Sequence, residues 1–117
     1  MAGRELILRR ADGTVVCGRC TLADHPLARL RGLLGREGLD SGEGLLLRPA
    51  SSVHTFFMRF PIDVVFLDRA LVVLGIHDGV DPWRAASQRG AKAVLELPAG
   101  ESSLRGLAVG DQLTLAA

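Results

Sequence analysis

The 117-residue chain carries 14 basic and 13 acidic residues, a net charge of +1, and 48% of its residues are hydrophobic. This composition excludes a disordered chain, which combines low hydrophobicity with high net charge, and the length corresponds to one domain over residues 1–117. Basic and acidic residues are interspersed, whereas a nucleic-acid-binding protein shows a basic patch, so we expect no nucleic-acid partner.

The N-terminal residues predict a cytoplasmic protein. Residues 1–10 contain only three consecutive apolar residues before two arginines, much less than the apolar region of a signal peptide. No apolar run in the chain approaches the length of a membrane-spanning helix, so no membrane span is expected. In the cytoplasm, Cys17 and Cys20 should be reduced.

The first predicted element is a β-hairpin. Residues 5–9 and 14–21 have strand patterns, and Asp12-Gly13 between them is typical of a tight turn.

The one clear helix is predicted near residues 25–35. Asp24 is a suitable N-cap, and Pro26 is suited to the first helical turn. Apolar residues then follow at helical spacing, namely Leu27, Leu30, Leu33 and Leu34. Gly35 or Gly38 should end the helix.

The middle of the chain is predicted to contain strands at residues 45–47, 53–58, 62–67 and 71–76. The last two are almost continuously apolar and are separated by residues 68–70, which predicts a hairpin in a central position. Pro61 interrupts the run before this hairpin.

The C-terminal third begins with Asp81-Pro82, a typical N-cap and first helical residue, so a short helix is expected over residues 83–88. A strand at 92–97, a helical turn at 102–106 and a strand at 112–115 follow. Seven or eight short strands with one clear helix favour a mainly β fold, a compact small barrel or sandwich.

Five motifs occur in an order that resembles the domain of unknown function 192 family. They are Gly32-Leu33-Leu34-Gly35-Arg36, Gly44-Leu45-Leu46-Leu47, the HTFFMRFPIDVVFLD segment at residues 54–68, the VLELPAG segment at 94–100, and Gly106-Leu107 through Gly110-Asp111. The resemblance covers roughly residues 30–115. It implies a compact β-rich domain and no established reaction. The familiar pattern has an Asn after the Met and basic residue of the central segment, which this chain lacks, and Cys17 and Cys20 lie outside the pattern.

Residues 54–68 contain all four Phe of the chain, whose only other aromatic residue besides His is Trp83. This concentration of large side chains predicts the centre of the core, a binding cleft, or both. The candidate ligand-binding residues are His54, Phe56, Met58, Arg59, Asp63 and Trp83. If residues 56–58 are extended, Phe56 and Met58 share one side and Phe57 lies on the other. Trp83 either covers the edge of the core or lines a pocket.

Asp63 lies in an apolar strand, where a carboxylate is costly unless it is paired. It either binds a ligand, as a general base or an anchor, or has a structural role, capping the turn at Phe60-Pro61 or pairing with Arg59. His54 is suited to proton exchange near neutral pH, but no Gly-x-Ser-x-Gly elbow accompanies it. Arg59 suits a carboxylate or phosphate ligand, or an ion pair with Asp63 or Asp68.

The motif formed by Cys17 and Cys20 has no second Cys-x-x-Cys. Strand residues three apart point to opposite faces, which is unsuited to joint metal binding or a disulfide. We therefore expect ordinary partly buried thiols, and no metal or cofactor.

The leading hypothesis is a non-enzymatic binding or accessory domain, monomeric or weakly dimeric, that holds a small polar molecule or a protein segment near residues 54–63. One alternative is a hydrolase-like, sugar-active or phosphate-active enzyme that uses Asp63 and His54. The other is a structural domain that pairs with another protein chain.

Overall fold

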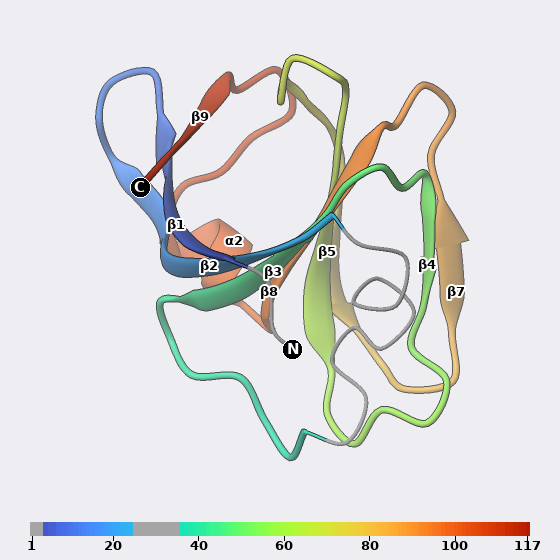
Figure 1. Ribbon diagram of the computed structural model, residues 1–117. Helices are drawn as coiled ribbons and strands as arrows, with labels where there is room; N and C mark the ends of the chain where they lie inside the picture. The colour runs from blue at the N-terminus through green and yellow to red at the C-terminus, as the bar shows by residue number, and fades with distance from the viewer. Residues whose placement is uncertain (1–3, 25–35) are drawn as a thin grey trace.

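The computed structural model describes residues 4–24 and 36–117 (Figure 1). The described strands are β1 (Arg4–Arg10), β2 (Val15–Ala23), β3 (Glu43–Leu47), β4 (Ser52–His54), β5 (Ile62–Leu67), β6 (Val73–Val80), β7 (Ala85–Ser87), β8 (Ala93–Pro98) and β9 (Leu113–Ala116). One short helix, α2 (Glu101–Leu104), is described. The expectation of a mainly β fold is confirmed. The helix expected near residues 25–35 lies outside the described residues, which contain no helix long and apolar enough to cross a membrane.

Seven strands form one curled sheet in the order β6-β5-β8-β3-β2-β1-β9 (Figure 1). Neighbouring strands are antiparallel except for β2 and β3, which are parallel. The two edge strands approach each other where Val72 bridges to Gln112, and the Leu113 N–H donates to the Leu71 carbonyl at 3.0 Å. The sheet is therefore a half-barrel rather than a flat layer.

Alternating side chains divide the apolar residues between the two faces of this sheet. In β5, Val65 and Leu67 belong to a first core inside the curl, whereas Val64 and Phe66 belong to a second core on the opposite face. This two-sided burial is the reason residues 62–67 are so continuously apolar, and the predicted hairpin is confirmed as β5 and β6. Its expected central position is correct for β5 and wrong for β6, because β6 is an edge strand with several exposed residues.

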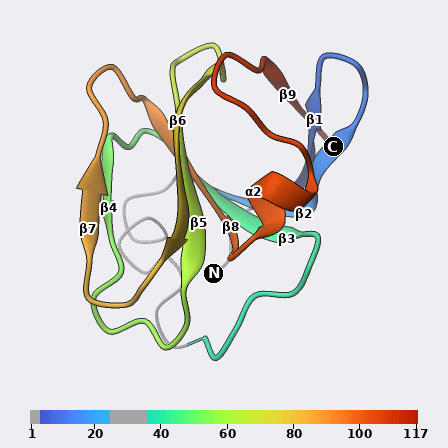
Figure 2. The same cartoon turned by 180° about the vertical axis from the view of Figure 1, so that it is seen from behind.

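The second core is covered by a separate two-stranded ribbon of β4 and β7, which lies beside β5 in both views (Figures 1 and 2). Val53 and Ala86 are cross-strand partners in this ribbon, and both pack against the second core. The helix expected over residues 83–88 is therefore wrong. Residues 85–87 form a strand instead, because pairing with β4 outweighs the weak helical preference of a short segment.

Cys17 and Cys20 point to the same face of the sheet, contrary to expectation. On β1, their Cα partners are Leu8 and Leu6, and a register irregularity lies between these two pairs. Between these two pairs, Gly18 and Arg19 of β2 oppose the single residue Ile7 of β1, which is a β-bulge. The extra residue returns both cysteines to the first core, where neither has exposed area.

Candidate functional site: an aromatic groove on the ribbon

Four aromatic side chains gather at the end of the ribbon and form what we call the aromatic patch: His54, Phe56, Phe57 and Trp83. Phe57 is 69% exposed and Trp83 is 56% exposed. The ring centroids of His54 and Phe56 are 4.9 Å apart, those of Phe56 and Trp83 are 5.8 Å apart, and those of Phe57 and Trp83 are 4.6 Å apart. Contiguous exposed apolar side chains on a small protein are typical of an interaction site.

The backbone is strained at two members of this patch. Phe57 has φ of 66° and Trp83 has φ of 67°. A bulky residue in the left-handed region costs about 1–2 kcal/mol, and such conformations persist where the surrounding structure imposes them, often at functional sites. Both strained residues expose their rings, so burial of these side chains does not offset the cost.

Thr55 joins the two turns that carry the patch. Its side chain is buried; the hydroxyl donates to the Asp81 carbonyl at 2.6 Å and accepts from the Arg84 N–H at 2.9 Å. Its backbone N–H donates to the Arg84 carbonyl at 2.8 Å, and its carbonyl accepts from the Trp83 N–H at 3.0 Å. These bonds fix the turn before Trp83 against the turn after His54.

Met58 packs the same turn against the second core. Its side chain is 6% exposed and belongs to the second core, while its N–H donates to the Thr55 carbonyl at 3.2 Å. The expected sharing of one side by Phe56 and Met58 is wrong, because residues 55–58 form a turn rather than a strand. The turn directs Met58 inward and leaves Phe56 exposed.

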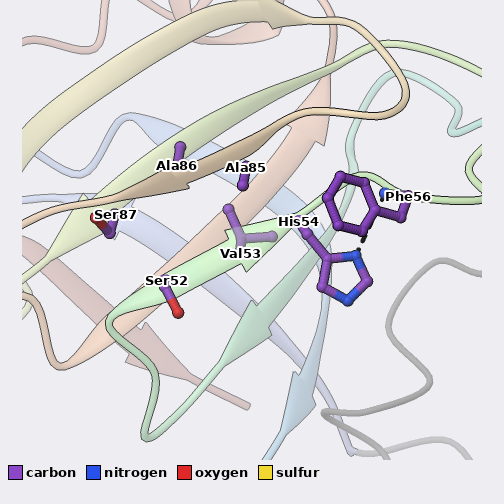
Figure 3. Close-up of a pocket in the computed structure, with 7 residues that line it drawn as sticks. All are labelled: Ser52, Val53, His54, Phe56, Ala85, Ala86 and Ser87. Atoms are coloured by element: carbon purple, nitrogen blue, oxygen red, sulfur yellow. Dashed lines mark hydrogen bonds between the residues drawn. The ribbon is translucent and has the colours of Figure 1, made fainter.

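A groove of about 570 Å³ runs along the ribbon beside the patch (Figure 3). Its described lining is Ser52, Val53, His54, Phe56, Ala85, Ala86 and Ser87. Ser52 pairs with Ser87 across the strands, and His54 pairs with Ala85. The exposed face of the ribbon is therefore a floor of small side chains, and the rings of His54 and Phe56 stand at one end of it (Figure 3).

His54 is oriented by a local hydrogen bond. The Phe56 N–H donates to His54 Nδ1 at 3.3 Å (Figure 3). With Nδ1 accepting, the neutral imidazole carries its proton on Nε2. The described lining contains no Asp, Glu, Lys or Arg.

The structure does not bring Asp63 into this groove. Asp63 has no exposed area, and its strand neighbours Ile62 and Val64 belong to the second core, so its carboxylate points to the opposite face. There Oδ1 accepts from the N–H groups of Gly79 at 2.8 Å and Gly100 at 3.0 Å, and Oδ2 accepts from the Ser102 N–H at 2.9 Å and hydroxyl at 2.7 Å. Burial alone would raise the pKa of Asp63, but these hydrogen bonds outweigh it and hold the pKa below its ordinary value.

Arg59 also lies apart from the lining residues. Its Nη1 is 3.7 Å from Glu37 Oε1, and both side chains are largely exposed. The expected ion pair of Arg59 with Asp63 or Asp68 is therefore wrong. Asp68 instead accepts the N–H groups of Ala70 and Val72 in the turn between β5 and β6.

Comparisons with known proteins agree with this fold. The family model DUF192, described as "Uncharacterized ACR", matches residues 7–115. This chain belongs to the DUF192 family. A UPF0127 protein of Thermococcus sibiricus is 31% identical to this DUF192 chain over 113 residues, which is 92% of the chain and 73% of the relative. A UPF0127 protein of Pyrococcus abyssi is 31% identical over 103 residues, covering 82% of this chain and 85% of the relative.

Two solved structures share the fold of this DUF192 chain. One, from Sinorhizobium meliloti 1021 and described as a candidate transcription regulator, has a TM-score of 0.82 at 24% identity and covers 95% of this chain and 92% of its own. The other, a protein of unknown function from Novosphingobium aromaticivorans, has a TM-score of 0.80 at 23% identity and covers 94% and 83%. At these identities, the likeness shows the fold alone.

The structure adds residues to the site that the sequence pattern did not indicate. Phe57 and Thr55 were obscured by the strand pattern assigned to residues 53–58, and Ser52, Ala85 and Ser87 carry no chemical signature of their own. His54, Phe56 and Trp83 lie together in the patch. Among the described residues, no group of three or more His, Cys, Asp or Glu side chains is arranged to hold a metal ion.

Proposed function

We propose that this DUF192 domain is a non-enzymatic binding domain that holds a peptide segment in the groove of the β4–β7 ribbon. The observation that carries the proposal is the aromatic patch itself, with two exposed rings on strained backbone. A chain with few aromatic residues keeps three of them, Phe56, Phe57 and Trp83, at the surface and in mutual contact. Such rings supply large contact areas at a low cost in conformational entropy.

The chemistry of the groove supports an uncharged, ring-bearing peptide. The small side chains of Ser52, Ala85 and Ser87 allow a ligand backbone to approach the ribbon closely. The rings of His54 and Phe56 offer flat faces against which a proline or aromatic ring stacks. His54 Nε2 and the two serine hydroxyls are available to orient the peptide amides.

The enzymatic alternative has less support from the geometry. His54 lies on the ribbon that covers the second core, whereas the Asp63 carboxylate faces the other side of the sheet and is saturated by hydrogen bonds. A base and its orienting partner must be within hydrogen-bond reach of each other. This arrangement favours binding over catalysis.

If the patch serves binding, its strained rings should be dispensable for folding. We expect Phe57→Gly and Trp83→Gly to change the free energy of unfolding by no more than about 1 kcal/mol, because relief at positive φ offsets the entropy that glycine loses on folding. Urea denaturation followed by circular dichroism measures this change.

Leu71 provides the matched control, because it has φ of 67° but only 7% exposure. Leu71→Gly should lower the free energy of unfolding by about 3 kcal/mol, because it removes a buried leucine side chain. If Phe57→Gly or Trp83→Gly were as costly as Leu71→Gly, the patch would be part of the core and the binding proposal would lose its main support.

A further inference from the structure

The two cysteines on β2 have a geometry that allows a bond between them. Because of the bulge, Cys17 and Cys20 occupy the positions of strand residues two apart, opposite Leu8 and Leu6. Residues two apart on a strand have Cα atoms about 6.6 Å apart. Disulfide-linked Cα atoms lie about 4.4–6.8 Å apart, so the spacing of two same-face strand positions does not exclude a bond.

The surroundings of the pair bring the sulfur atoms together. Cys17 and Cys20 both belong to the first core, and Cys17 Sγ lies 3.5 Å from the Gly42 carbonyl oxygen. On the neighbouring strand, Gly44 is the Cα partner of Cys20. A Cβ at Gly44 would lie 2.7 Å from Cys17 Sγ, so the absence of a side chain there makes room for the sulfur.

We propose that Cys17 and Cys20 form a redox-active dithiol, which a small peroxide oxidises to an intramolecular disulfide in the folded protein. The inference is independent of the peptide-binding groove, since the pair lies in the first core on the other face of the sheet. Both thiols lack exposed area. A small oxidant such as hydrogen peroxide therefore reaches them through local opening of the structure.

The reaction balances in two steps. The Cys17 thiolate attacks one peroxide oxygen, the O–O bond breaks, and the products are a sulfenic acid on Cys17 and hydroxide, which takes up a proton to become water. The Cys20 thiol then attacks the Cys17 sulfur, the S–O bond breaks, and a second water leaves with the Cys20 proton. In total, two thiols and one hydrogen peroxide give one disulfide and two waters.

The order of the steps follows from the opposite pKa directions of the two thiols. The neighbouring Cys20 thiol, as a donor to the Cys17 thiolate, lowers the pKa of Cys17. Its interaction with Cys17, together with burial, raises the pKa of Cys20. Cys17 is therefore the nucleophile toward peroxide, and Cys20 resolves the sulfenic acid.

The test is treatment of the full chain with hydrogen peroxide under native conditions, followed by intact mass measurement. We expect a product lighter by two hydrogen atoms, restored by dithiothreitol, with an unchanged circular dichroism spectrum during the reaction. Methionine oxidation adds an oxygen and is separated by mass. Sub-denaturing urea should leave the rate nearly unchanged, because local opening exposes little surface.

Two single variants test the assignment of Cys17 as the nucleophile and Cys20 as the resolving thiol. Cys20→Ser should accumulate a sulfenic acid that dimedone traps on Cys17, whereas Cys17→Ser should react more slowly in the same assay, because burial still raises the pKa of its remaining thiol. Absence of the disulfide in the wild type, or a rate that rises in proportion to the unfolded fraction, would overturn the proposal. The wild-type result decides the matter even if a variant fails to fold.

Discussion

Asp63→Asn is expected to lower the free energy of unfolding by about 3 kcal/mol at neutral pH. Asp63 Oδ1 accepts from the N–H groups of Gly79 and Gly100, and Oδ2 accepts from the Ser102 N–H. The single proton of the Ser102 hydroxyl is shared between Asp63 Oδ2 at 2.7 Å and Asp78 Oδ1 at 2.8 Å. An asparagine must turn its NH₂ group toward one of these pairs of donors. At least one buried backbone N–H then loses its acceptor, which costs the full desolvation of that group.

Asp68→Asn is the matched control for this measurement. Asp68 also accepts two backbone N–H groups, from Ala70 and Val72, but both bonds go to Oδ1. An asparagine oxygen can keep both, so the expected change is below about 1 kcal/mol. Equal urea midpoints for Asp63→Asn and the wild type would contradict the structural role of Asp63.

The pH dependence of Asp63 has a defined sign. Its pKa in the folded protein lies below the ordinary value of 3.8, because the hydrogen bonds outweigh the effect of burial. The stabilisation is therefore fully present above pH 3.8 and is lost as the pH falls through the lower folded value. Asp63→Asn should lack this part of the acid transition.

Whereas Asp63→Asn should destabilise the protein, Glu96→Gln is expected to stabilise it at alkaline pH. Glu96 is 3% exposed, and its Cα partners Leu45 and Val64 belong to the second core. Its Oε1 atom has no hydrogen-bond partner among the described residues. Burial raises the pKa of Glu96 from 4.5 to about 7, so the folded protein holds the carboxyl neutral where the unfolded chain ionises it.

The wild type should therefore lose stability as pH rises from 4.5 to about 7, in total about 3 kcal/mol. Glu96→Gln is uncharged throughout and should keep most of this stability at pH 8, while differing little from the wild type at pH 4. Urea denaturation at several pH values from 4 to 8 gives the two curves.

Glu101 is the matched control, a glutamate that is 4% exposed but fully hydrogen-bonded. It accepts from the Gly42 N–H at 2.8 Å, from the Ser41 hydroxyl and from Arg105. Although burial opposes it, the net pKa of Glu101 is lowered, so Glu101→Gln should destabilise the protein at neutral pH. Parallel pH curves for Glu96→Gln and the wild type would show that Glu96 does not titrate in this range.

Elements with a strong local sequence pattern were predictable from sequence. The pair β5 and β6 follows from uninterrupted apolar runs, and the N-terminal hairpin follows from Asp12-Gly13 between two strand patterns. In both, local propensity and tertiary packing favour the same conformation.

Elements that depend on distant partners were not predictable. Residues 85–87 become a strand only because they pair with β4, and the local sequence does not indicate this pairing. The bulge that turns Cys20 toward Cys17 breaks the two-residue period on which the expectation of opposite faces depended. A structural role for Asp63 was one expectation, but its donors are the N–H groups of residues 79, 100 and 102 and the Ser102 hydroxyl, which are distant from it in the sequence.

The candidate site was predictable only in part. Aromatic residues are identified directly from the sequence, so His54, Phe56 and Trp83 were candidates before their positions were known. Their grouping depends on Thr55, whose hydroxyl bonds to Asp81 and Arg84 join two turns almost thirty residues apart. Arg59 was assigned a partner by proximity in sequence, and the fold provides Glu37 instead.

The central claim is that the groove on the β4–β7 ribbon binds a peptide, and an NMR titration of the ¹⁵N-labelled chain tests it most directly. The probes are short neutral peptides with a single proline, phenylalanine or tryptophan, alongside matched alanine peptides and monosaccharides. We predict saturable shifts of the amide signals of residues 52–56 and 83–87 with ring-bearing peptides, and about tenfold weaker binding by Phe56→Ala. Saturable shifts elsewhere, or none in these residues with any ring-bearing peptide, would contradict the account.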